Sequence, residues 1–234
     1  MRIPAGLLQS ERAISRGHWR DIGEGISVIA RSRALLTVIV VWGIVQISSG
    51  WMNVSEIVLA KVTFSSGAFG YGLLWATTGV GLVVGSILGG EWVERRGVPV
   101  VYPLALAAMA VAELLVALSP NVWVAAAAMA LSGLGNGAAF VTNVLLVQRG
   151  AADAVRGRAF TVIMSSSFVM LSLAMLTAGP FIDAVGPRWV WVAMSAVVWF
   201  ATLVAVAMTR PLGVPDRPPP PMRPVVPERS RLRI

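Results

Sequence analysis

Six polar side chains interrupt two long apolar stretches of the sequence at spacings that suit a helix. They are Gln46, Ser49, Asn53, Ser132, Asn136 and Asn143. Within each stretch the spacings of three, four or seven residues place the side chains on one face of an α-helix. In lipid, a polar group is costly unless it faces protein or water. Each stripe therefore predicts either the lining of a small-molecule cavity or hydrogen-bonded packing between helices.

Glu113 is the one acidic residue well inside an apolar stretch of the sequence. A carboxyl group held inside a membrane protein is a candidate for carrying a proton, which makes Glu113 a candidate for proton coupling. Glu113 also lies only five residues before Leu118, the expected end of its helix. The second interpretation is that its side chain reaches the membrane surface, and a lipid-facing position would exclude the proton role.

Residue types that would support other chemistry are scarce. The chain has no cysteine, which excludes disulfides and thiolate metal sites, and the single histidine, His18, excludes a multi-histidine site. We therefore expect no metal and no cofactor. A membrane-embedded enzyme needs clustered His, Asp, Glu or Ser groups, and the sequence shows no such constellation, so we expect no catalytic residues and no enzymatic activity.

The elements that carry these residues are predicted to be membrane-spanning helices. Hydrophobic residues make up 56 % of the 234 residues and charged residues only 13 %, whereas soluble domains carry about a quarter charged residues. Six segments reach the roughly twenty apolar residues that a span needs: 34–55, 68–90, 99–118, 122–146, 159–182 and 188–209. The second carries Gly81, Gly85 and Gly89 on one face, which predicts close helix packing. The expected fold class is an all-α membrane protein with six transmembrane helices.

The placement of the basic residues predicts the topology. Of the eighteen arginines and one lysine, only Lys61 and Arg188 fall on one side of the six predicted spans, and the other seventeen fall on the opposite side with both termini. Cytoplasmic loops collect positive charge, and an excess of arginine over lysine favours a bacterial chain. We expect a multi-pass protein of a bacterial cytoplasmic (inner) membrane with both termini cytoplasmic. Because topology explains the net charge of +8, we expect no nucleic-acid partner.

The segments outside the six spans have their own character. Apolar residues recur at helical spacing over 17–31, which predicts an amphipathic helix along the inner membrane surface; the alternative is a plain extension of the first span. Beyond Arg210 the chain is rich in proline and arginine and is predicted to be a disordered cytoplasmic tail. The expected division is a cytoplasmic segment 1–33, a transmembrane domain 34–209 and a tail 210–234.

A short motif occurs twice at matched positions. The second predicted span ends with Gly90-x-x-x-Glu94-x-x-Gly97, and the fifth ends with Gly179-x-x-x-Asp183-x-x-Gly186. Each copy closes the second helix of a three-helix group. Because three is an odd number, the two copies lie on opposite sides of the membrane. The pattern predicts two inverted three-helix repeats.

The first copy, read with its arginine as Gly90-x-x-x-Glu94-Arg95-x-Gly97, resembles the loop signature of the major facilitator superfamily, Gly-x-x-x-Asp-Arg-x-Gly. It departs from that signature because Glu94 replaces the aspartate and Val98-Pro99 stand where basic residues follow. The segment 179–189 is similar to the end of the eleventh helix in the drug, macrolide and siderophore exporter branch. The resemblance covers about residues 20–209 and implies the carboxy-terminal six-helix half of such a protein.

The resemblance implies export of a hydrophobic or amphipathic small molecule, such as a drug-like compound or a siderophore, by alternating access. It also implies a second six-helix half, on another chain or on a second copy, and the equivalents of the two polar stripes line the family's central cavity. Proton coupling through Glu113 is an additional expectation. The expected loop-motif and gating residues are Gly90, Glu94, Arg95, Gly97, Asp183 and Gly186. The alternative is a non-transporting accessory or truncated membrane protein.

Overall fold

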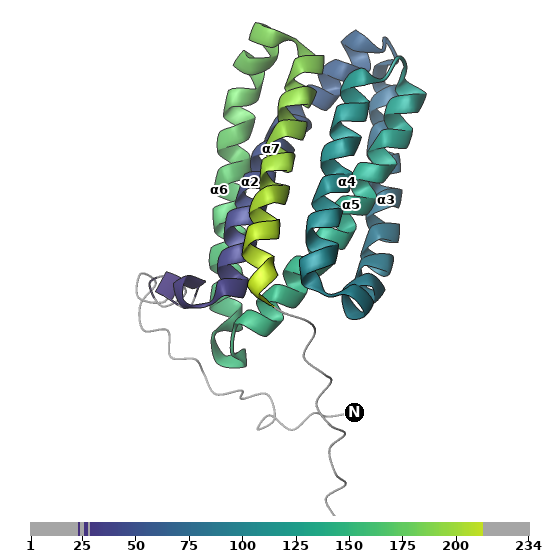
Figure 1. Cartoon of the computed structure of the whole chain (residues 1–234). Coiled ribbons are helices and arrows are strands. Elements are labelled where there is room, and N and C mark those ends of the chain that lie inside the picture. Colours follow the sequence, from purple (N-terminus) through teal and green to yellow (C-terminus); the bar gives the residue numbers. More distant parts are fainter. Residues whose placement is uncertain (1–22, 24–25, 28, 213–234) are drawn as a thin grey trace, which may run out of the picture.

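The structure is a computed structural model that describes residues 23, 26–27 and 29–212. All regular secondary structure in these residues is helical, and six helices are long and apolar enough to cross a membrane, which confirms the predicted fold class. The six are α2 (Arg33–Val58), α3 (Gly67–Arg96), α4 (Val98–Leu118), α5 (Val122–Gly150), α6 (Asp153–Val185) and α7 (Pro187–Thr209). They lie side by side in one bundle (Figure 1).

The two ends of the bundle differ in charge. Helix α2 begins and α7 finishes at one end, which also carries the arginines at the α3–α4 and α5–α6 links, and we call it the arginine-rich end (Figure 1). Lys61 and Arg188 lie at the opposite end, called the Lys61 end. The helices thus separate the basic residues as the sequence predicts. Which side of the membrane each end faces stays a prediction.

Helix α2 extends past the predicted end of the first span at residue 55. It continues to Val58 and then as a π-helix, η2 (Leu59–Thr63). The chain turns after this π-helix, where Ser65 has a φ of 51° and the Ser66 hydroxyl donates to the Ala60 carbonyl at 2.8 Å. Glu56, which the sequence interpretation placed just outside the first span, therefore lies within a long helix.

The chain before α2 is helical at the described residues 23, 26–27 and 29–31. Ser32 interrupts the helical path with φ −107° and ψ 114°, and its hydroxyl accepts a 3.5 Å hydrogen bond from the amide of Leu35. Ser32 therefore separates the described helical residues before it from α2, and the amphipathic helix over 17–31 stays a prediction, since most of its first half lies outside the described residues. Residues 1–22 and 213–234, which include most of the predicted proline-rich tail, lie outside the described residues. A short 3-10 helix, η3 (Arg210–Leu212), ends the described chain.

The two copies of the glycine motif form the same turn. Gly97 has φ 78° and ψ 160°, and Gly186 has φ 83° and ψ 157°. Each glycine amide donates to the carbonyl four residues earlier, and a proline stands in the first turn of the following helix. This backbone conformation is almost restricted to glycine. Identical turns at opposite ends of the bundle are what inverted repeats require.

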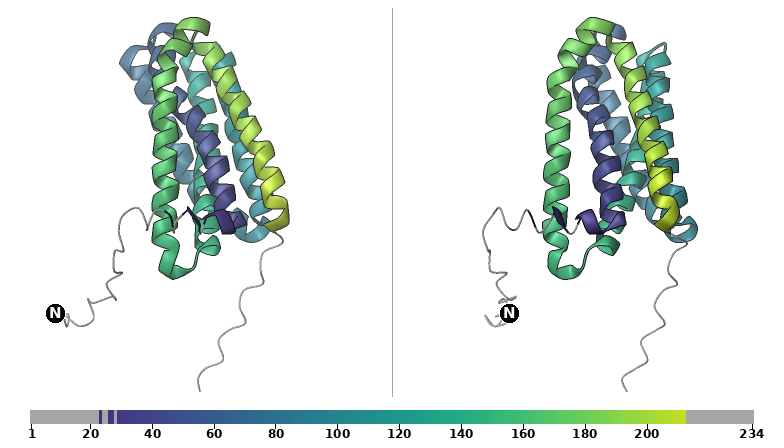
Figure 2. Two further views of the ribbon diagram at one scale, coloured as in Figure 1. Left: turned by 90° about the vertical axis from the view of Figure 1, so that its left-hand side faces the viewer. Right: turned by 60° about the vertical axis from the view of Figure 1, so that its left-hand side comes forward.

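Helix packing follows the same symmetry. The main packed pairs are α3 with α5, α2 with α6, α4 with α5, α7 with α2, α4 with α7, and α2 with α5. Exchanging α2, α3 and α4 for α5, α6 and α7 maps this set of pairs onto itself. Helices α4 and α7 pack together, and α2 lies between α6 and α7 (Figure 2). Helices α2 and α5 are thus the inner helices, flanked by α6 and α3.

Glycines allow α3 and α5 to pack at backbone distance. A Cβ atom on Gly85 would clash with the Leu134 carbonyl, and one on Gly133 would clash with the Thr78 carbonyl. Gly81 and Gly89 are buried against the same helix, close to Ala130 and Ala138. The predicted packing role of the α3 glycines is confirmed. The opposite pair, α2 with α6, has one such contact, where Gly50 of α2 meets Leu171 and Ala174.

Candidate functional site

The two predicted polar stripes lie on the inner helices α2 and α5, which contact each other. Gln46, Ser49 and Asn53 on α2 and Asn136 on α5 are half-buried. The other two, Ser132 and Asn143, are buried. The structure thus places the stripes on adjacent helices between α3 and α6. Their role in lining a substrate cavity stays a prediction.

Part of the α2 stripe is bonded to its own helix. The Asn53 side-chain amide donates to the Ser49 carbonyl at 2.7 Å, and the Ser49 hydroxyl donates to the Val45 carbonyl at 3.2 Å. Such bonds satisfy donors within the helix and leave the carbonyl oxygen of the Asn53 side chain as an acceptor. Gln46, one turn nearer the arginine-rich end, has no hydrogen bond to the described residues. The stripe offers a ligand a few polar atoms in an otherwise apolar surface.

Asn143 on α5 is held by a residue that the sequence interpretation missed. The Tyr102 hydroxyl of α4 donates to Asn143 Oδ1 at 2.7 Å, and Tyr102 is fully buried. The Asn143 Nδ2 atom is buried without a partner among the described residues. The hydrogen bond to Tyr102 fixes the amide so that its N–H group points away from Tyr102. Asn143 therefore contributes to packing between α4 and α5 and also lines the adjoining cavity.

That cavity is small and has mainly aromatic walls, and a wider groove lies beside it. Its walls include Trp42 of α2, Phe140 of α5 and Phe160 of α6, together with Asn143. A groove of about 430 Å³ between α5 and α6 shares walls with it and runs to the arginine-rich end. The residues lining both spaces are Val144, Val147 and Phe160. The cavity beside Asn143 measures about 20 Å³, which is room for about one water molecule, and Asn143 does not line the wider groove.

Glu113 lies inside the bundle. It is only 2 % exposed, and the Ser48 hydroxyl of α2 donates to its Oε1 atom at 2.9 Å. The Oε2 atom is buried and has no hydrogen-bond partner among the described residues. The interpretation that Glu113 reaches the membrane surface is therefore wrong, because α4 turns this side chain toward α2. The condition that would have excluded a proton role, a lipid-facing side chain, is not met.

Glu56 is a second buried carboxyl group, and sequence reasoning missed it. It is 1 % exposed, and its Oε1 atom has no hydrogen-bond partner among the described residues. It was missed because the first span was expected to end one residue earlier. Its spacing was the available signal, since Glu56 follows Asn53 by three residues and Ser49 by seven, on the same helical face. Glu56 and Glu113 are the two charged residues that are buried in the described part of the chain.

The charged residues of the loop motif are exposed beside the two glycine turns. Arg95 pairs with Glu91 at 3.6 Å and not with the motif residue Glu94, which is exposed. Asp183, the matching acid of the second copy, is exposed as well. Neither acid caps the following helix. The N-cap residue of that helix is a glycine, which has no side chain to accept a hydrogen bond. The motif therefore has a clear role in the backbone turn, and its role in gating stays a prediction.

Arg188 ties the helices together at the Lys61 end. Its Nη1 atom donates to the Ala117 carbonyl at 2.7 Å, in the last turn of α4. The guanidinium also lies over the ring of Phe64, 5.8 Å from the ring centre. A positive charge at a helix C-terminus is favourable. These two contacts link α7 to the end of α4 and to the segment after η2, at the Lys61 end of the bundle.

Six long apolar helices in two inverted triplets, with sparse polar groups between the inner helices, define a polytopic membrane protein built like one half of a transporter. The sequence profile of the Major Facilitator Superfamily matches residues 33–233. The chain belongs to this superfamily, and it is therefore a membrane transport protein in the broad sense. No curated protein matches the chain.

Proposed function

We propose that the chain is one half of an exporter that moves a hydrophobic or amphipathic small molecule by alternating access against a second six-helix half. Superfamily membership supports membrane transport in general. The resemblance of segment 179–189 to the drug, macrolide and siderophore exporters supports the direction and the class of cargo. The second half would be another chain or a second copy of this one.

The observation that carries this proposal is the uneven burial of the helices. Helices α3 and α6 are each buried along only 22 % of their most apolar stretch, against 61 % for α4. Between α3 and α6 lie α2 and α5 with their polar residues. A face with polar groups at its centre and apolar helices at its margins fits a partner that seals the margins and leaves a cavity between.

The groove of about 430 Å³ between α5 and α6 supports the proposed cargo. Val144, Val147 and Phe160 give it apolar walls, and Gln148 and Arg156 are its polar residues. Pockets of this composition bind apolar molecules and use single polar groups to orient them. The cargo would carry aromatic or aliphatic surface with one or two hydrogen-bond acceptors, and it would enter by the groove at the arginine-rich end.

Glu113 is the proposed proton carrier. The position supports this role, because the carboxyl group is buried and its Ser48 partner lies on α2, which also carries a polar stripe. Adding or removing a proton changes the charge that α2 meets and so can alter how α2 packs against α4. Coupling would then run from Glu113 through α2 to the substrate face, with proton entry driving export.

A flux experiment tests the transport part of this proposal. The chain, together with its second half where a separate chain supplies it, is reconstituted in liposomes and given an apolar fluorescent cargo and a proton gradient. We expect Glu113→Gln to abolish proton-driven flux. The glutamine side chain still offers Ser48 a carbonyl acceptor, but it cannot take up or release a proton. Glu94→Gln removes an exposed acid and should leave flux unchanged. Unaltered proton-driven flux in Glu113→Gln would exclude Glu113 as the carrier.

The oligomeric state in nanodiscs tests the need for a second half. Light scattering should give a defined dimer, or a stable pair with a second six-helix chain. Asn136→Ala should then lower cargo affinity without changing the measured mass. A monodisperse monomer that binds no partner and moves no cargo would contradict autonomous transport, and it would favour the alternative of an accessory membrane protein.

A further inference from the structure

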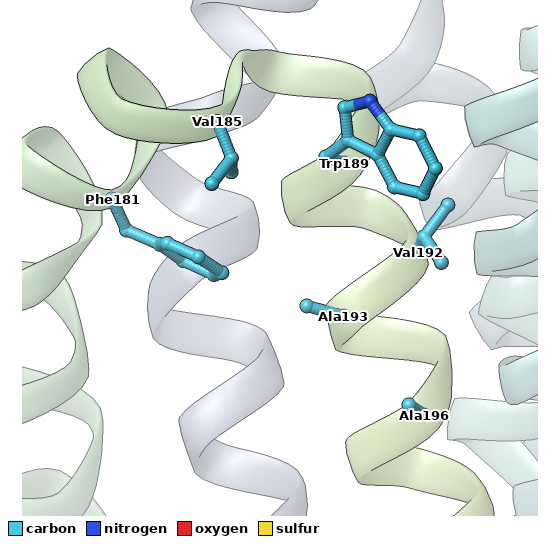
Figure 3. Close-up of a pocket in the computed structure, with 6 residues that line it drawn as sticks. All are labelled: Phe181, Val185, Trp189, Val192, Ala193 and Ala196. Carbon is cyan, nitrogen blue, oxygen red and sulfur yellow. The ribbon is translucent and has the colours of Figure 1, made fainter.

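Two grooves lie at the outer surface of the bundle, one at each end. One, of about 310 Å³, lies between α3 and α4 at the arginine-rich end, and its walls include Trp92, Val100 and Leu104. The other, of about 510 Å³, lies between α6 and α7 at the Lys61 end. Figure 3 shows Phe181 and Val185 of α6 projecting toward α7 in this second groove. Neither groove includes a residue of the polar stripes.

The inverted repeat makes these two grooves equivalent. The motif copies align Gly97 with Gly186, a shift of 89 positions. The same shift pairs four wall positions of the first groove with four of the second. The pairs are Trp92 with Phe181, Arg96 with Val185, Val100 with Trp189, and Leu104 with Ala193. The fold therefore builds one groove twice, and the side chains in the two copies can be compared position by position.

The comparison isolates a difference in charge. Arg95 and Arg96 line the groove at the arginine-rich end, whereas the equivalent positions are Ala184 and Val185. The lining of the second groove is entirely apolar, from Phe181 to Ala196. The chain has thus placed two guanidinium groups in one copy of the groove and none in the other.

We propose that the groove between α3 and α4 is a binding site for an anionic phospholipid. Its guanidinium groups lie in the last turn of α3 and its apolar wall continues along α4, from Val100 to Leu104. A phospholipid has this arrangement, with a phosphate at the membrane surface and acyl chains that run inward. Trp92 lies in the same wall, and tryptophan favours the level of the headgroups.

Charge supports an anionic lipid over a neutral one. Arg95 forms an ion pair with Glu91 at 3.6 Å, and Arg96 has no ion pair among the described residues. Glu91 and Glu94 are exposed on the same turn but do not line the groove. Basic pockets between transmembrane helices are known to select acidic headgroups.

Native mass spectrometry of the delipidated chain tests the site. Phosphatidylglycerol and phosphatidylcholine with the same acyl chains are titrated, and the first phosphatidylglycerol is expected to bind more tightly. Arg95→Gln/Arg96→Gln should weaken that binding by about tenfold or more and leave phosphatidylcholine unchanged. The matched control is Arg149→Gln/Arg210→Gln, which removes two exposed arginines from the same end outside the groove and should have no such effect.

A transplanted site keeps the proposal testable if the double glutamine variant folds poorly. Ala184→Arg/Val185→Arg places the two guanidinium groups in the equivalent groove at the Lys61 end. We expect this variant to gain one additional tightly bound phosphatidylglycerol. Absence of that gain in a folded variant would contradict the idea that the arginines and the groove are sufficient.

Tryptophan quenching locates the lipid. Phosphatidylglycerol with brominated acyl chains should quench fluorescence more than the matching phosphatidylcholine. The excess should vanish in Trp92→Phe and persist in Trp189→Phe. Three outcomes overturn the proposal: equal binding of the two lipids, equal loss in the Arg149/Arg210 control, or full competition by soluble glycerol phosphate. The last would indicate a free-anion site, and displacement of the lipid by a second chain would indicate a protein interface.

Discussion

At the scale of single residues, the interior of this bundle holds polar groups that are only partly satisfied. The Tyr102 hydroxyl and Asn143 Oδ1 satisfy each other, while Asn143 Nδ2 and one oxygen each of Glu56 and Glu113 have no partner among the described residues. Unsatisfied buried groups cost about 1–3 kcal/mol each. In a transporter such groups are available for a ligand or a proton, and we interpret these three atoms in that way.

Sequence could predict which residues are chemically notable but not their partners. Glu113 stands out in any apolar segment, yet its partner Ser48 is 65 residues away, and only the rotation of α2 against α4 brings them together. Tyr102 and Glu56 were missed for related reasons. Tyr102 is apolar enough to be taken for an ordinary core residue. Glu56 lay one residue beyond the predicted end of the first span, and hydropathy locates the ends of helices poorly. The direction of a side chain depends on packing that a single-helix pattern does not contain.

Tyr102→Phe should destabilise the bundle by about 1 kcal/mol, a typical value for a hydrogen bond between membrane helices. The change removes a hydroxyl and leaves Asn143 Oδ1 buried without its donor. Thermal unfolding in nanodiscs measures the effect. Tyr71→Phe is the matched control, because Tyr71 is half-buried and its hydroxyl makes no hydrogen bond in the described structure. Equal loss in both variants would show that the Tyr102 bond adds no stability of its own.

At the scale of elements, six membrane-spanning helices were predicted and the described residues form six, but these helices are longer than predicted. Helix α6 begins at Asp153 instead of 159, and α5 ends at Gly150 instead of 146. Hydropathy detects only the part of a helix that suits lipid, while the helix itself continues until a cap or turn ends it. The two glycine turns were predicted from spacing because their backbone conformation demands glycine.

Close packing of α3 on α5 predicts different outcomes for two glycines on different faces of α3. Gly85→Ala should destabilise the bundle by about 1–3 kcal/mol, because the new methyl group would meet the Leu134 backbone. Gly90→Ala points into open space and should be neutral or slightly stabilising, since alanine favours a helix. Thermal unfolding of both variants measures these changes in the stability of the bundle. A stable Gly85→Ala variant would mean that α3 and α5 are not in backbone contact.

The repeated turn predicts matched effects at two distant sites. Gly97→Ala and Gly186→Ala should each cost about 1–3 kcal/mol, because alanine strongly disfavours their backbone conformation. The two costs should agree closely if the turns are equivalent. Gly79→Ala, within α3 and facing open space, serves as the control for a glycine in a regular helix. A large cost at only one of the two turns would contradict their equivalence.

At the scale of the whole molecule, inverted symmetry and charge act together. The repeat gives the bundle two similar ends, and basic residues then distinguish them: among the described residues, Lys61 and Arg188 lie at one end and the other arginines at the opposite end. The same logic applies to the two outer grooves, which lie at equivalent positions of the repeat, while arginines line only the groove between α3 and α4. Symmetry in the fold thus supplies equivalent positions, and the sequence assigns them different roles relative to the membrane.

The charge difference predicts which end faces the cytoplasm, and the absence of cysteine makes the test simple. Val62→Cys places a single thiol on a side chain 70 % exposed at the Lys61 end, and Ala152→Cys places one at an exposed position of the arginine-rich end. A membrane-impermeant maleimide added to intact cells should label Val62→Cys and spare Ala152→Cys until the membrane is opened, because positive loops stay inside. Both thiols should react fully in detergent, which controls for local access. Labelling of Ala152→Cys in intact cells would reverse the orientation, and cargo would then enter the α5–α6 groove from outside the cell.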